Sequence, residues 1–207
     1  MWYPILVGML ASYLLGNLNG AVCMSALMHD DVRSHGSGNA GLTNFIRNFG
    51  AGRAVYVILI DGIKAALACV VTGLLLQPYG LYQEGAALGG LAVMLGHNFP
   101  ALLGFKGGKG ILSGLFIALT VDWRIALIIL AVFLLTYLLT QYVSLGSILA
   151  AAAFAVSFVL LHFDNLTVAV CGGIMGTLAV FMHRGNILRL LKGTERKTNL
   201  FKKGESH

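Results

Sequence analysis

The sequence predicts an all-α integral membrane protein: a polytopic bundle of about seven transmembrane helices in one domain, residues 1–207. The chain is 57% hydrophobic and only 11% charged, whereas soluble domains carry about 25% charged residues. Its apolar segments are also long enough to cross a hydrocarbon core of about 30 Å. Since backbone amides cannot stay unpaired in lipid, these segments are expected to be helices.

The predicted spans follow the apolar segments in order. They cover residues 3–28, 53–76, 84–103, 111–121, 124–141, 144–161 and 166–182. The first lacks a basic leader and an A-x-A cleavage site, so it is expected to be retained. Gly85, Gly89 and Gly90 in the third indicate close helix packing. The fourth is short, and we expect it to be tilted or only partly spanning.

The basic residues predict the orientation. One set of connecting segments holds Arg33, Arg47, Arg53, Lys106 and Lys109, together with the basic C-terminal tail. The opposite set holds Arg124 and three carboxylates. The excess of positive charge on the cytoplasmic side of membrane proteins therefore predicts an N-terminus outside and a C-terminus in the cytoplasm.

The net charge of +6 has a simple explanation, because basic loops orient a membrane protein and contact anionic lipid. The basic residues lie at a membrane face without interleaved aromatic residues, so the sequence does not favour a nucleic-acid partner. The three cysteines fall inside apolar segments and show no metal-ligand spacing, so packing is their expected role.

A polar segment after the first span, residues 35–47, reads HGSGNAGLTNFIR. It offers hydrogen-bonding side chains and one arginine, whose planar fork suits a phosphate or carboxylate. These candidate site residues are Ser37, Asn39, Thr43, Asn44 and Arg47. The same composition is also typical of an ordinary turn with helix caps.

A second polar segment, FKGGKG, occupies residues 105–110 and directly precedes the fourth span. Backbone amides of Gly107, Gly108 and Gly110 are expected to approach a phosphate closely, with charge from Lys106 and Lys109. The positive end of the following helix adds to this site. The spacing differs from that of a nucleotide-binding P-loop, and a flexible basic turn is the alternative explanation.

A third polar segment, HRGNILRL, begins at residue 183. His183 and Asn186 share one face of a helix leaving the membrane. Glu195 follows Gly193, which is expected to end that helix. A histidine at a helix end is more often a partner of the helix dipole than a catalyst, but all three segments lie on the same predicted face and are expected to converge.

Polar residues also interrupt two spans. Asp61 and Lys64 lie one turn apart in the second span. Charges inside a membrane are candidates for function, although an ion pair that ties helices together is the favoured interpretation here. The sequence leaves the same two roles, functional or structural, open for Asn17 and Asn19 in the first span.

Several catalytic signatures are missing. None of the histidines is followed five residues later by Asp, so the His/Asp dyad of acyl-thioester acyltransferases is absent. The G-x-S-x-G turn of serine hydrolases is absent too. No carboxylate cluster indicates a Mg²⁺ site, so neither a metal nor a cofactor is expected. These absences indicate a substrate that is already activated.

In this order the three segments resemble the bacterial acyl-phosphate:glycerol-3-phosphate acyltransferase family. The matching motifs are GSGNxGxTNxxR at residues 36–47, GHxFP…FKGGKG at 96–110 and HRxNIxRLxxGxE at 183–195. They cover about a quarter of the chain. The sequence departs from the family at Leu42, at residues 111–113 and at residues 16–20, and none of these departures removes a polar group of the motifs.

The resemblance implies transfer of a fatty acyl group from acyl phosphate to the 1-hydroxyl of sn-glycerol 3-phosphate, at the cytoplasmic face of the bacterial inner membrane. The products are lysophosphatidic acid and phosphate, used in phospholipid synthesis. It implies catalytic roles for Ser37, Arg47, His183 and Asn186, and support from His97 and Glu195. Membrane lipid and a soluble enzyme that supplies acyl phosphate are the implied partners.

Two other functions fit part of the pattern. A transporter of phosphate or phosphate esters also binds phosphate in a membrane, but such sites usually lie near the midplane between repeats. A membrane scaffold explains basic loops but not three clustered polar motifs.

Overall fold

The structure, a computed structural model, describes residues 2–197 and is all-helical over that range. Its α-helices are α1 Trp2–Gly16, α2 Gly20–Ala26, α3 Leu42–Phe49, α4 Ala54–Leu76, α5 Tyr82–Asn98, α6 Ile111–Val121, α7 Trp123–Thr140, α8 Val143–Leu161, α9 Leu166–Met182 and α10 Arg184–Leu191. Three short 3-10 helices are η1 Val32–Ser34, η2 Gln77–Tyr79 and η3 Ala101–Leu103.

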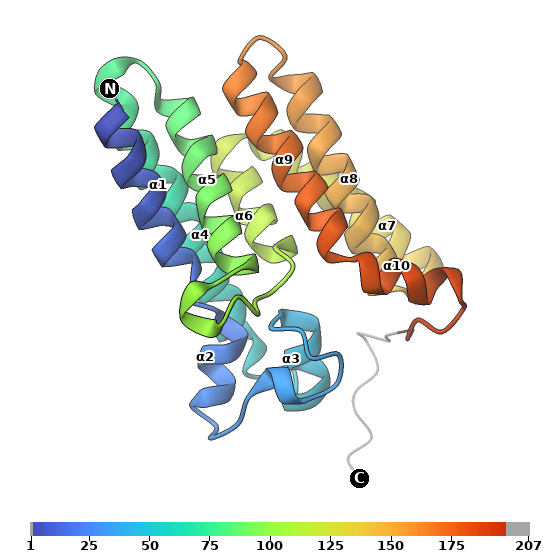
Figure 1. The fold of residues 1–207 in the computed structure, drawn as a ribbon. Coiled ribbons are helices and arrows are strands. Elements are labelled where there is room, and N and C mark those ends of the chain that lie inside the picture. The colour runs from blue at the N-terminus through green and yellow to red at the C-terminus, as the bar shows by residue number, and fades with distance from the viewer. Residues whose placement is uncertain (1, 198–207) are drawn as a thin grey trace.

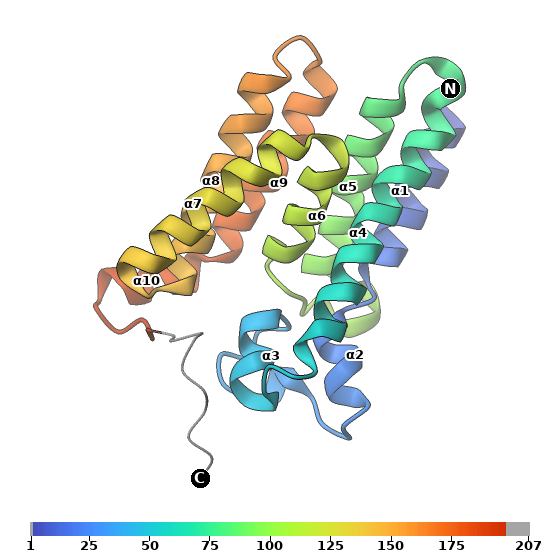
Figure 2. The same ribbon diagram turned by 180° about the vertical axis from the view of Figure 1, so that it is seen from behind.

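The long helices run side by side in two groups. Helices α1, α4, α5 and α6 form one group, and α7, α8 and α9 form the other (Figure 1). The view from behind shows the same grouping, with α2 and α3 below the first group and α10 at the corresponding end of the second (Figure 2). The three polar segments therefore lie at one end of the bundle, and the N-terminus lies at the other.

One main core joins the two groups. Buried residues of α4, α5, α6, α7, α8 and α9 form a continuous apolar cluster that includes Val93, Met94, Ile117, Phe158 and Met175. Small residues let the helices approach closely, because a Cβ at Gly89 would overlap the Ala68 carbonyl oxygen of α4. Large apolar side chains such as Leu135 and Leu138 remain exposed on the outside of the bundle, as expected for a surface that faces lipid.

The first predicted span is not one helix. The chain bends by 42° between α1 and α2, and Asn19 stabilises the break. Its side-chain oxygen accepts a hydrogen bond from the Val22 amide at 3.0 Å, which caps α2. Its side-chain nitrogen donates to the Ala40 carbonyl at 2.9 Å. The asparagines in this span therefore mark the point where the chain leaves the bundle to build the polar end.

The other predicted spans correspond to helices. Four helices are long and apolar enough to cross a membrane, and two bent pairs, α1 with α2 and α9 with α10, pass the same test together. Helix α6 is apolar but short, with 11 residues, as the sequence indicated. The total of seven spans and the orientation in the membrane stay predictions.

The polar end has a small core of its own. Ala21, Val32, Phe45 and Val57 from α2, η1, α3 and α4 are fully buried in it. This core holds α3 and the preceding loop at a fixed place below the main bundle. Part of the basic C-terminal tail, residues 198–207, lies outside the described residues.

Candidate active site

A large cavity opens at the polar end, with a volume of about 1000 Å³. All three polar segments contribute to its lining. Of the candidate site residues, the cavity is lined by Ser37, Asn39, Thr43, Asn44, Arg47, His97, Lys109, Gly110, His183, Asn186 and Glu195. Residues far apart in the sequence thus meet at one place.

The cavity has two chemically different halves. The polar half carries the cationic side chains of Arg47, Lys109, Arg189, Arg196 and Lys197. The other half is a wall of apolar side chains from α6, α7 and α8, namely Ile111, Leu112, Leu115, Ile129, Leu130, Phe133, Val143 and Ala150. We call this surface the apolar wall. The cavity therefore suits an anionic head group joined to an apolar chain.

The second and third polar segments are connected by a chain of side-chain contacts. The ammonium of Lys109 donates to the side-chain oxygen of Asn186. The amide nitrogen of Asn186 donates to Glu195 Oε1 at 3.0 Å, and Arg189 Nε donates to Glu195 Oε2 at 2.7 Å. Each member of the chain fixes the next, so the cations keep defined positions at the cavity surface.

Burial and neighbouring charges shift the pKa values of Lys109 and Glu195, which belong to this series of contacts. Burial, with repulsion from Arg189 and Arg47, lowers the pKa of Lys109 from 10.5 to about 8, against the attraction of Glu195. Burial alone would raise the pKa of Glu195, but hydrogen bonds from Arg189 and Asn186 outweigh it and hold that pKa below its ordinary value. Glu195 therefore stays a carboxylate at neutral pH.

His183 lies at the bend of 52° between α9 and α10. Its ring is buried, and Nδ1 lies 2.8 Å from the Ala179 carbonyl oxygen. A carbonyl oxygen can only accept, so Nδ1 carries the proton and Nε2 is left as an acceptor. The residue therefore presents an unprotonated nitrogen, oriented by the backbone rather than by a carboxylate.

The helix start at the second polar segment has the features of an anion site. Gly110 and Ile111 line the cavity, and no side chain caps α6 at Gly110. The first amides of a helix have no partner within it, and the helix dipole favours negative charge there. Lys109 stands beside these amides, so this part of the cavity is set up for phosphate.

Two glycines of the predicted phosphate loop, Gly107 and Gly108, pack closely against the protein itself. The Gly108 amide donates to the His97 carbonyl at 3.1 Å, and a Cβ at Gly108 would overlap the His97 ring. Gly107 packs equally closely on the backbone of His97 and Asn98. Both glycines permit close packing within the protein, and neither lines the cavity. That their amides bind phosphate stays a prediction.

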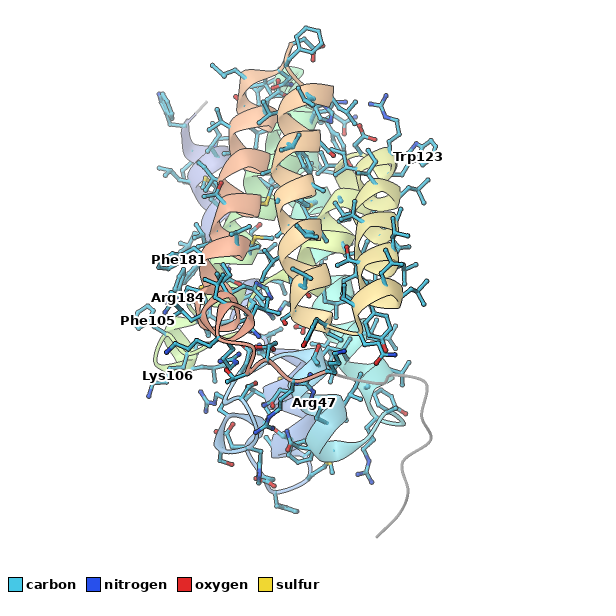
Figure 3. The ribbon with its side chains drawn as sticks, turned by 90° about the vertical axis from the view of Figure 1, so that its right-hand side faces the viewer. Arg47, Phe105, Lys106, Trp123, Phe181 and Arg184 are labelled. Carbon is cyan, nitrogen blue, oxygen red and sulfur yellow. The ribbon has the colours of Figure 1, made fainter. Side chains whose placement is uncertain are left out.

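Lys106 is also not part of the cavity. Its side chain is exposed and points away from the body of the protein next to Phe105 (Figure 3). The turn that buries Gly108 directs Lys106 outward. Lys109 is thus the lysine of this segment that lies at the site.

Asn44 lines the cavity, but its side chain supports the loop. Its nitrogen lies 2.9, 3.0 and 3.1 Å from the carbonyl oxygens of Val32, His35 and Asn39. Its oxygen accepts from the Ser37 amide at 3.1 Å. These bonds give Asn44 a structural role and hold Ser37 in place. A substrate contact by Asn44 stays a prediction.

Arg47 extends from α3 toward the polar half of the cavity (Figure 3). It stands one turn after Thr43, so the two side chains share a helix face. Ser37 and Asn39 precede them in the loop. These four groups are lining residues of the first segment, which also contributes Gly36, Gly41, Leu42 and Asn44.

Sequence reasoning missed several lining residues. Arg189 belongs to the third motif, and its position six residues before Glu195 was an available signal. Ser144 and Ser147 line the cavity from the start of α8, and their spacing of three in an apolar helix also marks one face. The apolar wall carried no recognisable signal, since its residues resemble those of any spanning helix.

Three comparisons with known proteins agree with this picture. A family model described as glycerol-3-phosphate acyltransferase matches residues 6–193. A glycerol-3-phosphate acyltransferase of a Thermoanaerobacter species is 39% identical over 199 residues, covering 94% of this chain and 96% of the relative. The corresponding protein of Clostridioides difficile is 36% identical over 188 residues, covering 90% of this chain and 91% of the relative.

Solved structures are similar over the same length. A crystal structure of PlsY (YgiH), an integral membrane glycerol 3-phosphate acyltransferase in its glycerol 3-phosphate form, superposes with a TM-score of 0.84 at 32% identity, covering 96% of this chain and 99% of that chain. The lysophosphatidic acid form of PlsY gives a TM-score of 0.82 at 33% identity, covering 94% of this chain and 95% of that chain.

Proposed function

Because the chain belongs to the glycerol-3-phosphate acyltransferase family, we propose that it transfers a fatty acyl group from acyl phosphate to the 1-hydroxyl of sn-glycerol 3-phosphate. The products are lysophosphatidic acid and inorganic phosphate. The observation that carries this proposal is the cavity itself, in which cationic groups and the apolar wall lie side by side. Acyl phosphate and lysophosphatidic acid both combine a phosphate with a long apolar chain.

The acyl donor is assigned to the part of the cavity next to the apolar wall. Its phosphate lies at Lys109 and the uncapped start of α6, and its chain follows α6, α7 and α8. Ile111 and Leu112 continue directly from the phosphate site into the wall, which supports this placement. Glycerol 3-phosphate is then bound by the first segment, with its phosphate at Arg47 and its polar groups near Ser37 and Thr43.

We choose acyl phosphate as the donor because its reaction needs little activation by the protein. Phosphate is a good leaving group, so an acyl phosphate requires little activation. The acceptor hydroxyl oxygen attacks the carbonyl carbon, the bond from that carbon to the phosphate oxygen breaks, and the electron pair leaves with phosphate. Positioning of the two substrates supplies much of the acceleration.

His183 receives the proton of the attacking hydroxyl in this scheme. Its Nε2 is unprotonated, and Asn186 lies one turn further along with Lys109 bound to it. As the carbonyl oxygen becomes negative, Lys109 and Asn186 stabilise the charge. The proton then passes to the departing phosphate, which leaves His183 neutral for the next cycle.

The proposed function also includes a location and an orientation in the membrane. The three polar segments face the cytoplasm of a bacterial inner membrane, the N-terminus lies outside and the C-terminus lies in the cytoplasm. The product then forms in the inner leaflet, where phospholipid synthesis continues. A soluble enzyme must supply the acyl phosphate, and the whole chain acts as one domain.

The experiment uses purified protein in detergent or lipid with radiolabelled glycerol 3-phosphate. Palmitoyl phosphate, palmitoyl-CoA and palmitoyl-acyl carrier protein are offered in separate reactions without added metal. We expect labelled lysophosphatidic acid from palmitoyl phosphate alone. Product from a thioester instead would overturn the donor assignment. No product from any donor, with uptake of labelled glycerol 3-phosphate into proteoliposomes, would favour a transporter.

A further inference from the structure

A group of buried polar side chains lies directly beneath the polar end, between α4 and α5. Asp61, Lys64 and His97 are only 1%, 3% and 4% exposed. Lys64 Nζ lies 2.7 Å from Asp61 Oδ1 and 2.9 Å from His97 Nδ1. The Gly20 amide donates to the same Asp61 oxygen at 3.1 Å. Burying these charges is costly, and an ion pair alone would not require the histidine.

The number of hydrogens on Lys64 determines which nitrogen of His97 is protonated. The ammonium has three hydrogens, and its acceptors are Asp61 Oδ1, the Leu18 carbonyl, His97 Nδ1 and, furthest away at 3.3 Å, the Gly16 carbonyl. If Nδ1 carried a proton, it would face the ammonium donor at 2.9 Å, and its nearest carboxylate oxygen is 3.6 Å away. Nδ1 is therefore the acceptor, and the proton of the neutral ring is on Nε2.

The protonated edge of the ring lies where the first two polar segments meet. A Cβ at Gly108 would overlap His97 Nε2 and would lie 2.9 Å from the Ala40 carbonyl oxygen. Gly108 adjoins Lys109, and Ala40 lies between Asn39 and Gly41, which line the cavity. His97 and Asp61 line the same cavity. The ring is thus held from below by Lys64 and reaches the ligand-binding space at this junction.

We infer that His97 binds substrate phosphate through its Nε2 hydrogen, beside Lys109, and that Lys64 and Asp61 are positioning residues that keep the ring in this state. The inference rests on the proposed function, because it assigns the donor phosphate to Lys109. It adds a third phosphate contact, from inside the bundle, to Lys109 and the start of α6. The buried ion pair then has a role in ligand binding as well as in packing.

The kinetic test compares two substitutions of His97, one that keeps a hydrogen-bond donor and one that removes it. Glutamine places an amide hydrogen near the position of Nε2, whereas leucine has no donor. We expect His97→Leu to raise the KM for palmitoyl phosphate about tenfold or more, as for the loss of a hydrogen bond to a charged group, with the KM for glycerol 3-phosphate changed less than twofold. His97→Gln should recover most of that loss.

A matched control is available at the other end of the bundle. His162 is 7% exposed, and its Nε2 lies 3.2 Å from Asp122 Oδ2. His162→Leu removes a buried histidine next to a carboxylate and should leave both KM values unchanged. Equal losses in His97→Leu and His97→Gln, in variants that melt at the wild-type temperature, would overturn the inference, since packing alone would then explain the effect.

The positioning role has its own spectroscopic signature. In protein labelled with ¹⁵N-histidine, the ring signals of His97, assigned by their loss in His97→Gln, should show a protonated Nε2 and an unprotonated Nδ1. The neutral double variant Asp61→Asn/Lys64→Met should populate both tautomers and raise the KM for palmitoyl phosphate like His97→Leu. A protonated Nδ1 in the wild type would overturn the inference. This readout needs no turnover, so it separates failure of the inference from failure of the proposed function.

Discussion

Lys109 and Asn186 are hydrogen-bonded although 77 positions separate them in the sequence. Lys109 belongs to the loop that precedes α6, in the first group of helices, and Asn186 lies in α10, at the end of the second group. Their contact closes the polar half of the cavity between the two groups. The same two residues are the ones we propose to act on the donor, so the geometry of the reaction depends on how the groups are packed.

Ser37→Ala should lower kcat/KM about 10- to 100-fold, because the hydroxyl is proposed to hydrogen-bond an anionic substrate. Ser37 is exposed in the loop, so the free energy of unfolding should change by less than about 0.5 kcal/mol. Initial rates with radiolabelled glycerol 3-phosphate and thermal melting in detergent measure the two quantities. Wild-type kcat/KM in this variant would remove Ser37 from the site.

Asn44→Ala should behave differently, since the side chain holds the loop. Its removal leaves the buried carbonyl of Val32 without its side-chain donor and the Ser37 amide without its acceptor. We expect a loss of about 2–4 kcal/mol in stability, together with a loss of activity. A variant that is inactive but melts like the wild type would instead support the direct substrate contact predicted from the sequence.

Binding of the acyl donor should weaken at alkaline pH. The pKa of Lys109 is lowered to about 8, so in the free enzyme the ammonium charge is lost as the pH rises through that value. The KM for palmitoyl phosphate should rise above pH 8, approaching tenfold per pH unit if only the charged form binds. Lys109→Arg, which stays charged, should flatten this profile; an unchanged profile would contradict the assignment.

The lowered pKa of Lys109 also affects stability. Whereas a rise in pH weakens binding of the donor, it increases the contribution of Lys109 to the free energy of unfolding. The folded pKa of Lys109 lies below the unfolded value of 10.5, so the unfolded chain binds more protons between about pH 8 and 10.5. The contribution of Lys109 to the free energy of unfolding therefore increases with pH in that window. Lys109→Met should remove this contribution, which melting curves of the two proteins at several pH values would detect.

Gly108→Ala should disrupt the site through overpacking. The added Cβ would overlap the His97 ring and press on the Ala40 carbonyl, at a cost of about 1–3 kcal/mol or more. We expect activity to fall at least 100-fold at 37 °C. Gly52→Ala is the control, because no atom lies within 4 Å of a Cβ at that position and its φ is not positive. Similar behaviour of the two variants would show that the loop has room to adjust.

His183→Ala should lower kcat by about 10²–10⁴ with little change in either KM, as expected for a general base. If a phosphate oxygen of a substrate accepts the proton instead, the loss should stay near tenfold, since only orientation is removed. Measuring kcat at saturating palmitoyl phosphate and glycerol 3-phosphate distinguishes the two. A large rise in KM with unchanged kcat would assign His183 to substrate binding.

Composition and motifs were sufficient to predict the helical membrane fold and the meeting of three distant segments. Long apolar segments have few alternatives in lipid, and three polar motifs at one predicted face have to lie near one another. The same reasoning identified lining residues in all three polar segments. It could not distinguish Lys106 from Lys109, because the turn between them sets which lysine faces the cavity.

The details that the sequence could not give have a common physical cause. Glycine indicates that something approaches the backbone closely, but not whether it is a ligand or the protein itself; at Gly107 and Gly108 it is the backbone and ring of His97. Asn44 is likewise of a residue type that is common in binding sites. Only its neighbours in the structure reveal that it makes hydrogen bonds within the protein. The bend at Asn19 depends on Ala40, a residue outside the first span.

The bend between α1 and α2 has a consequence for biosynthesis. Asn19 at that bend binds Ala40 of the first loop, and Gly20 binds Asp61 of α4, so the bend gains its second contact only after α4 has been made. The last lining residues, near position 195, are translated after every long helix. A nascent chain therefore enters the membrane without a competent site, and the site is complete only after the segment that follows α10 has been made.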